Sequence, residues 1–417
     1  MDSLHKSDRL TLKIERIAHG GEGIALHQGK VVFVKGAFPG DEVQVDILES
    51  KKSFARAVVH EVVHASPMRV AQRCPAAAAG AGCCDFGELD PAAEISLKKD
   101  ILIDQLRRLG KVENTPPIQV VDLQPNARWR TRVRLGVDST GRAGFRRAQS
   151  NEVISGEVCV QAVEGLLDGV VGPQAPAFTP GAEVVAVRDD EGNRHVVEVR
   201  RAPRGRRNEK VTNVIEGSGL ATQEVGGVKF QLPAVAFWQA HLAAPEAYSE
   251  VIRRWLSLAP NTPRSGVKVI GWDLYGGVGA FVPAIMEGIG VPAVVHSVEA
   301  SHQAANAGRA AFKEVFSDDD AHAVVFHPTS VERALDQLPV PDVVVLDPPR
   351  IGAGATVVEA VAAAAPAKVI HIGCDPATFA RDTATWTRSG YRLVEVVLFN
   401  AFPGTHHMEA VGLFEPA

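Results

Sequence analysis

Two residues near the end of the chain have the chemistry of a nucleophile and a base. Cys374 follows an apolar segment that ends His-Ile-Gly and stands at the start of a predicted helix. The positive end of a helix lowers the pKa of a thiol, which favours a thiolate nucleophile. Glu409 begins the final apolar segment, where a carboxylate can act as a general base. The simpler interpretations are a small buried cysteine and an exposed carboxylate at the end of a strand.

A glycine-rich loop indicates a bound cofactor. The loop reads Asp-Leu-Tyr-Gly-Gly-Val-Gly, follows an apolar strand, and contains Asp273, Tyr275, Gly277 and Gly279. About 20 residues past the loop, Glu299 ends the next strand, where a carboxylate can accept hydrogen bonds from ribose hydroxyls. The pattern differs from Gly-x-Gly-x-x-Gly, which favours S-adenosylmethionine over a dinucleotide. A structural turn and a solvated strand end are the alternative.

A further apolar strand ends Val-Val-Val-Leu-Asp-Pro-Pro-Arg and places Asp347 at its end, in a turn stiffened by two prolines. A cysteine, a glutamate and a methyl donor at one edge suggest methylation of a pyrimidine at carbon 5. Addition of a thiolate to carbon 6 makes carbon 5 nucleophilic, and a base must then remove the proton from carbon 5.

The order of elements after about residue 240 predicts how these residues come together. Apolar segments such as VKVIGWDLYG, AVVHSVEA and VVVLDPP alternate with alanine-rich helical stretches. This alternation predicts an α/β fold with a doubly wound, mostly parallel sheet, whose ligands bind at the carboxyl ends of the strands. The last two strands, YRLVEVVLF and MEAVGLFE, are predicted to form an antiparallel hairpin at the edge of the sheet.

The chain before this α/β part is predicted to be rich in strands. Short apolar strands within residues 1–66 predict a small closed β-barrel of the OB type. Residues 67–230 are predicted to form a central, mostly β domain, apart from an amphipathic helix over residues 92–110. The α/β domain then covers residues 231–417.

The composition is that of a globular protein, and its charge is unevenly distributed. The chain has 417 residues, 46% of them hydrophobic, and a formal charge of −5. The negative balance argues against a nucleic-acid binder, but arginines are concentrated in the central domain. No apolar run is long enough for a membrane span and the start has no signal core, so a cytoplasmic location is expected.

Two arginine-rich segments could contact RNA. The first has Trp129 inside it as a possible stacking surface for a base, and its arginines could instead form a solvated strand face. The second contains a possible basic loop. The first segment includes Arg128, Arg130, Arg132 and Arg134, and the second includes Arg200, Arg201, Arg204, Arg206, Arg207 and Lys210.

The chain resembles the bacterial RNA uracil-5-methyltransferases, especially the 23S rRNA enzymes with a TRAM domain and an iron–sulfur cluster. The sequence GCDPATFARD, around Cys374, is similar to the family's nucleophile motif SCNPxTxARD. The sequence FPGTHHME, ending at Glu409, is similar to FPxTxHxE. The resemblance implies that Cys374 is the nucleophile and Glu409 the base, in a Rossmann-like domain that binds S-adenosylmethionine.

The same resemblance assigns further parts of the chain. Gln239 matches a glutamine that contacts S-adenosylmethionine, and residues 1–66 match the TRAM domain, an RNA-binding barrel. The helix over residues 92–110 would pack on the catalytic domain. The chain departs from the family's motifs at Gly373, Asp375, Gly276, Ala280 and near Thr329.

Four of the five cysteines lie outside the catalytic motifs. Their number suits a four-iron four-sulfur cluster, with a zinc ion and free thiols as alternatives. Family members use Cx5CxxC plus a distant cysteine, whereas this chain has Cx8CC plus a distant cysteine. The four are Cys74, Cys83, Cys84 and Cys159.

The sequence therefore predicts an enzyme that forms 5-methyluridine in RNA, with 23S rRNA favoured over tRNA as the substrate. The alternatives are a non-catalytic RNA-binding protein of the same fold and a small-molecule methyltransferase. We expect RNA to be the partner, no membrane or obligate protein partner, and a monomer.

Overall fold

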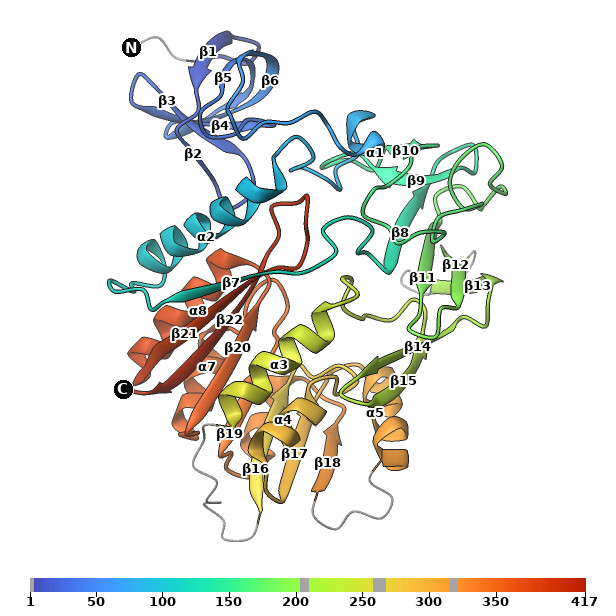
Figure 1. Cartoon of the computed structure of the whole chain (residues 1–417), viewed down its shortest axis with the longest axis vertical. Helices are drawn as coiled ribbons and strands as arrows, with labels where there is room; N and C mark the ends of the chain where they lie inside the picture. Colours follow the sequence, from blue (N-terminus) through green and yellow to red (C-terminus); the bar gives the residue numbers. More distant parts are fainter. Residues whose placement is uncertain (1–3, 203–209, 258–267, 316–321) are drawn as a thin grey trace.

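The computed structural model describes residues 4–202, 210–257, 268–315 and 322–417. Figure 1 shows an N-terminal sheet at one end, a helix-covered sheet at the other, and a central sheet beside the junction. Arg204, Arg206 and Arg207, which the sequence placed in a possible basic loop, lie outside the described residues. No helix in the described part of the chain is long and apolar enough to cross a bilayer.

The N-terminal part is a six-stranded sheet with the order β1-β5-β6-β4-β3-β2. Alternate residues of β5 are buried, including Val43, Val45 and Ile47, because neighbouring side chains of a strand point to opposite faces. These residues form a separate apolar core under the sheet. The strands are β1 (Arg9–Lys13), β2 (Arg16–Ile17), β3 (Gly23–His27), β4 (Lys30–Lys35), β5 (Glu42–Ser50) and β6 (Phe54–His64).

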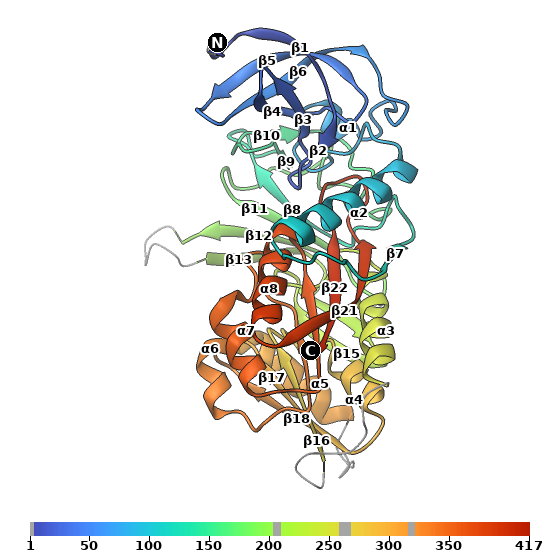
Figure 2. The same ribbon diagram turned by 90° about the vertical axis from the view of Figure 1, so that its left-hand side faces the viewer.

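The connection to the rest of the chain contains α1 (Pro75–Ala78) and α2 (Pro91–Arg108). The Asp90 side chain caps α2 by accepting a hydrogen bond from the Ala92 N–H at 2.9 Å. The buried face of α2 packs against α8 (Pro376–Arg388). In both views α2 lies between the N-terminal sheet and the C-terminal sheet (Figures 1 and 2).

The central sheet has the order β10-β9-β8-β11-β12-β13. The following hairpin forms its own two-stranded sheet and packs on α5 (His302–Val315), where the rings of Phe230 and Phe312 are 5.7 Å apart. The central strands are β8 (Arg132–Val137), β9 (Ala143–Arg146), β10 (Val153–Ser155), β11 (Glu183–Arg188), β12 (Arg194–Arg201) and β13 (Lys210–Glu216), and the hairpin is β14 (Leu220–Val225) and β15 (Val228–Pro233).

The C-terminal sheet has eight strands in the order β18-β17-β16-β19-β20-β22-β21-β7. The pairings from β18 to β20 are all parallel, which confirms the predicted mostly parallel sheet. The strands are β16 (Val269–Leu274), β17 (Ala293–Val298), β18 (His322–His327), β19 (Val343–Leu346), β20 (Lys368–Gly373), β21 (Tyr391–Asn400), β22 (Glu409–Pro416) and β7 (Ile118–Asp122).

The antiparallel pairing of β21 with β22 is confirmed, but the expectation that this hairpin forms the edge is wrong. Residues 118–122, which were predicted to belong to the central domain, form β7 and pair with β21 at the edge of the C-terminal sheet. A short apolar strand does not reveal its partner, because the pairing depends on where the preceding α2 lies.

Helices cover both faces of the C-terminal sheet. One apolar core lies under α3 (Ala244–Leu256), α4 (Val282–Ile289) and α5. A second core lies under α2, α8, α6 (Val331–Ala334) and α7 (Gly354–Ala363), and a short 3-10 helix, η1 (Leu335–Gln337), follows α6. All four residues of β19 are buried, as expected for a strand covered on both sides.

Candidate active site

The glycine-rich loop and the acid that follows it are in direct contact. The Glu299 carboxylate accepts hydrogen bonds from the Gly277 N–H at 3.2 Å and the Ser301 N–H at 2.6 Å. The Gly276 N–H donates to the Val298 carbonyl at 3.0 Å, which fixes the loop against the end of β17. Gly277 and Tyr275 have positive φ angles of 59° and 61°, so the chain turns sharply there.

Two carboxyl groups lie where the strand order changes direction, between β16 and β19. Burial raises the pKa of Asp273 to about 7, and burial together with Asp273 raises the pKa of Asp347 to about 7. The Ser297 hydroxyl donates to Asp273 at 2.8 Å. A cofactor with hydroxyl or amino groups could hydrogen-bond to these carboxyl groups, and such switch points are the usual ligand sites of doubly wound sheets.

Close packing explains the glycine at residue 276. A Cβ atom at this position would lie 2.1 Å from an oxygen of Asp273 and 2.4 Å from the Ser297 hydroxyl. In this chain the carboxyl group of Asp273 therefore occupies the space that a side chain at residue 276 would need.

Antiparallel pairing brings Cys374 next to Glu409. Gly373, the last residue of β20, pairs with Ala410 of β22, so the residue after Gly373 faces the residue before Ala410. The electrostatic influence of Glu409 on the Cys374 thiol agrees with this placement. The predicted nucleophile and the predicted base are more than 30 positions apart in the sequence, and the pairing of β20 with β22 brings them together.

The expectation of a lowered thiol pKa is wrong. Burial raises the pKa of Cys374 to about 12, and Glu409 and Asp347 contribute in the same direction. The first N–H groups of α8 are taken by Asp375, whose side chain accepts from the Ala377 and Thr378 N–H groups at 3.0 and 2.8 Å. The capping carboxylate thus occupies the positive end of the helix that was expected to stabilise a thiolate.

Glu409 is buried, and one of its carboxyl oxygens has no hydrogen-bond partner among the described residues. Burial raises its pKa well above the ordinary value and Asp347 adds to this, whereas Arg350 lowers it. Arg350 also lowers the pKa of Cys374. An unpaired, buried carboxyl beside a thiol has the arrangement of a general base that is completed by a substrate.

Sequence reasoning missed Tyr248 of α3, and it recorded Arg350 only as part of a motif. The Tyr248 hydroxyl is buried without a hydrogen-bond partner in the described structure. Burial raises the pKa of Tyr248, and the charges of Glu409, Asp347 and Cys374 raise it further. The tyrosine therefore borders the same site. A tyrosine at helical spacing in an apolar stretch gives no sequence signal for such a role.

Gln239 lies between β15 and α3, beside the buried Trp238. The segment leads directly into α3, the helix that carries Tyr248. The structure gives no cofactor contact for Gln239, so its role stays a prediction.

The predicted RNA-contacting arginines differ in exposure. Arg128 and Arg134 are exposed and form ion pairs with Glu164 and Glu183. Arg132 is largely buried, and burial lowers its pKa to about 10. Arg130 lies over the Trp129 ring at 4.9 Å.

The expectation that Trp129 stacks on an RNA base is wrong. Its side chain is 0% exposed and stacks on the His241 ring at 5.4 Å. The Phe402 ring contacts it edge-on at 6.1 Å. The arginines around an aromatic residue do not determine which way its side chain points. Here the backbone directs the Trp129 side chain inward, to the junction between domains.

The four remaining cysteines lie together although 85 residues separate the first from the last. Hydrogen bonding to the other three thiols lowers the pKa of Cys74, and contacts within the group raise the pKa of Cys83, Cys84 and Cys159. Among the described residues, no group of three or more cysteines, histidines or acids is arranged so that it could hold a metal ion. The cluster therefore stays a prediction.

Two known protein families match the N-terminal and C-terminal parts of the chain. Residues 7–60 match the TRAM domain family. Residues 300–416 match the tRNA (uracil-5-)-methyltransferase family, and this range contains both Cys374 and Glu409.

Relatives match over nearly the full length. An RNA methyltransferase of Corynebacterium efficiens is 53% identical, covering 99% of this chain and 96% of the relative. A 23S rRNA (uracil(1939)-C(5))-methyltransferase, RlmD, of Shewanella frigidimarina is 30% identical, covering 98% and 96%. The Pyrococcus abyssi tRNA (uracil-54, C5)-methyltransferase, solved with S-adenosyl-L-homocysteine, has a TM-score of 0.69 at 19% identity, covering 97% of this chain and 100% of that chain. The last likeness shows a common fold.

The fold and these matches define the class of the protein, an RNA methyltransferase. The chain belongs to the S-adenosylmethionine-dependent RNA (uracil-5-)-methyltransferase family, with a TRAM domain at its N-terminal end.

Proposed function

We propose that this enzyme methylates carbon 5 of a uridine in 23S rRNA. The observation that carries the proposal is the placement of Cys374 opposite Glu409 at the edge that holds the glycine-rich loop. The RlmD relative, named for a 23S rRNA uracil, matches 98% of this chain and so includes the N-terminal and central parts as well.

Cys374 acts as the nucleophile in this proposal. Its sulfur forms a bond with carbon 6 of the uracil, and the electron pair of the 5,6 double bond moves toward the carbonyl at carbon 4 as an enolate. S-adenosylmethionine, when bound, supplies the methyl group to carbon 5. The thiol must lose its proton before attack, and Arg350 favours that loss because its positive charge lowers the pKa of Cys374.

Glu409 acts as the base that ends the reaction. Its carboxylate takes the proton from carbon 5, the 5,6 double bond re-forms, and the bond between carbon 6 and the Cys374 sulfur breaks. The unpaired carboxyl oxygen is free to accept this proton. A carboxylate with a raised pKa is a stronger proton acceptor once it is ionised. This helps the reaction because the proton on carbon 5 is bonded to carbon and is only weakly acidic.

The residues present fit S-adenosylmethionine. Glu299 would bind the ribose hydroxyls, and the backbone of Tyr275, Gly277 and Gly279 would let the cofactor approach closely. Asp273, Asp347 and Gln239 would supply the remaining polar contacts. A Cβ atom added at Gly277 would have no heavy atom within 4 Å, so there is open space beside the loop.

RNA would be held across the junction of the three parts. Carbon 5 of a stacked uracil is out of reach, so the base must be flipped into the site. The exposed Arg128 and Arg134 are suited to phosphate contacts, while Arg130 and Arg132 would support the surface beneath them.

The four clustered cysteines would hold a four-iron four-sulfur cluster with a structural role. Three of their side chains, those of Cys74, Cys84 and Cys159, are buried, and Cys74 and Cys159 raise the pKa of both Cys83 and Cys84. Burial lowers the pKa of Arg130 and the cysteines oppose this, so a guanidinium lies near enough to balance cluster charge. Anaerobic purification followed by iron and sulfide analysis tests this, and a metal-free or zinc-bound protein would contradict it.

The substrate is tested by mapping 5-methyluridine in rRNA and tRNA of a strain that lacks the gene. Loss of one 5-methyluridine from 23S rRNA, restored by the wild-type gene and not by a Cys374→Ala gene, is the expected result. Loss from tRNA would overturn the substrate assignment, and no loss at all would favour a non-catalytic RNA-binding role.

A further inference from the structure

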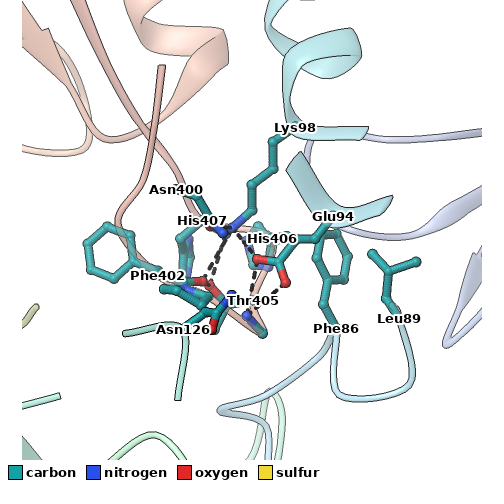
Figure 3. A network of polar contacts seen from close by, with 12 residues as sticks. Phe86, Leu89, Glu94, Lys98, Asn126, Asn400, Phe402, Thr405, His406 and His407 are labelled. Atoms are coloured by element: carbon teal, nitrogen blue, oxygen red, sulfur yellow. Dashed lines mark hydrogen bonds and ion pairs between the residues drawn. The ribbon is translucent and has the colours of Figure 1, made fainter. Parts of the chain in front are cut away.

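A buried ion pair of α2 holds the loop that precedes Glu409. The Lys98 ammonium donates hydrogen bonds to Glu94 at 2.6 Å, to the Asn400 side-chain oxygen at 2.6 Å, and to the Phe402 carbonyl at 3.3 Å. The Glu94 carboxylate also accepts from the Gly404 N–H at 2.9 Å. Figure 3 shows both side chains pointing from the helix toward the loop.

The same loop is held by residues on two further sides. The Phe86 N–H donates to the Gly404 carbonyl at 3.0 Å, and Asp85 accepts from the His406 N–H at 3.1 Å. The Gln161 amide donates to the Pro403 carbonyl at 3.1 Å. Segments near Cys84 and Cys159 therefore contact the loop directly, and the position of the loop depends on parts of the chain far from the catalytic sheet.

The ion pair is unusual because of its burial. The side chains of Lys98 and Glu94 are 0% and 1% exposed. Taking both charges out of water opposes folding, and an apolar pair of similar volume is often at least as stable. A stabilising role alone therefore explains the pair poorly. Apart from the hydrogen bond between Lys98 and Glu94 themselves, the hydrogen bonds described for the pair end on the loop or on Asn400.

Asn400 shows how the contact reaches the site. It is the last residue of β21, and its neighbour Phe399 pairs with Glu409, the first residue of β22. Lys98 thus fixes the position at which the chain leaves β21, and Glu94 fixes the loop before the chain enters β22. The two contacts lie on either side of the turn that presents the Glu409 carboxyl to Cys374.

We propose that Glu94 and Lys98 are positioning residues for Glu409, required for the removal of the proton from carbon 5 and not for the attack of Cys374. This inference rests on the proposed function. Cys374 is held by β20 and α8. Although α2 packs against α8, neither β20 nor α8 is hydrogen-bonded to the pair, so the hydrogen bonds of the pair support the Glu409 side of the site and not the Cys374 side.

The test compares two rates in the full-length protein. The variant Glu94→Gln/Lys98→Met removes both charges together, which avoids leaving one buried charge unpaired. Turnover on uridine RNA is expected to fall about 100-fold, as for a displaced catalytic group. The rate of adduct formation with 5-fluorouridine RNA, which needs no proton removal, is expected to stay within about twofold of wild type, because a factor of two is a small free-energy change. A covalent complex with ordinary uridine RNA should accumulate, as in Glu409→Gln.

The control is Lys368→Met/Glu415→Gln, which removes a buried lysine and its partly exposed glutamate at the ends of β20 and β22 that lie away from Cys374 and Glu409. It should leave both rates unchanged. Asn400→Ala serves if the double variant does not fold, and it should slow turnover more than adduct formation. Equal loss of both rates, or unchanged turnover, in a folded variant overturns the proposal. A wild-type protein that forms no fluorouridine adduct overturns the proposed function itself, and this inference with it.

Discussion

Burial and the neighbouring carboxyl group of Glu409 together raise the pKa of the Cys374 thiol to about 12. The charge of the base therefore opposes ionisation of the nucleophile in the free protein. One negative charge at the site disfavours a second, so Cys374 and Glu409 are expected to ionise at different stages of the reaction. Arg350 is the nearby cation that lowers both pKa values.

Removing Arg350 should slow the attack at neutral pH. The raised pKa means that the thiolate fraction of Cys374 grows about tenfold per pH unit below the pKa. In Arg350→Gln the pKa rises further, so the rate at pH 7–8 falls and the profile moves to higher pH. Alkylation of the Cys374 peptide by iodoacetamide, followed by mass spectrometry across pH, measures this. Arg392→Gln, at the start of β21, is the control, and identical profiles for Arg350→Gln and wild type would be inconsistent with the charge effect.

Gly276→Ala should weaken cofactor binding. The added methyl group would lie 2.1 Å from Asp273, so the carboxyl group would have to move from its place beside Ser297. Overpacking of about 1–3 kcal/mol, if it falls on the cofactor-bound state, corresponds to a roughly 5- to 140-fold loss of affinity. Titration calorimetry with S-adenosylhomocysteine measures it. Gly20→Ala, where the nearest atom is 4.0 Å away, is the control, and equal affinities for the two variants would refute the packing argument.

Tyr248→Phe should reduce activity without reducing stability. The hydroxyl lies unpaired in the described structure, so its removal costs no hydrogen bond in the free protein. If the hydroxyl bonds to the flipped base or to Glu409 during the reaction, kcat/KM falls about tenfold, the effect of one hydrogen bond of about 1.4 kcal/mol. Steady-state kinetics and thermal unfolding distinguish the two effects. Unchanged kinetics would mean that the hydroxyl serves neither substrate nor base.

Arg134→Ala should weaken RNA binding and reduce its salt dependence. The side chain is 45% exposed and pairs only at the surface with Glu183, so it can turn to a phosphate. Loss of one phosphate contact lowers the slope of log affinity against log salt by about 1. Filter binding at several salt concentrations checks this, with Lys229→Ala on β15 as the control. An unaltered slope would exclude Arg134 from the RNA interface.

The site could be predicted from the sequence where residues that are close in the chain form one local motif. The strand, the glycine-rich loop and Glu299 lie within about 30 residues, and the structure joins them through the hydrogen bond from Gly277. The motifs around Cys374 and Glu409 were recognised from their local patterns. Their mutual placement needed only the antiparallel pairing of two neighbouring strands.

Contacts over long sequence separations were not predictable. The bond from Lys98 to Asn400 spans 302 residues, and no pattern near either residue indicates it. The arginines around Trp129 indicated an exposed side chain, yet it is buried at a domain junction. Tyr248 has ordinary sequence surroundings, yet it borders the catalytic residues. The raised pKa of the Cys374 thiol depends first on its burial and then on the charges of Glu409 and Asp347, which the tertiary fold brings to it.

The most direct test of the account is covalent trapping. Wild-type protein, S-adenosylmethionine and a 23S rRNA fragment with 5-fluorouridine are expected to give a denaturation-resistant complex. Mass spectrometry should show the Cys374 sulfur bonded to carbon 6 and a methyl group at carbon 5, because fluorine cannot leave as the proton does. Cys374→Ala should give no complex. Tight binding of this RNA without any complex, or a complex that persists in Cys374→Ala, would contradict the assignment of Cys374 as the nucleophile.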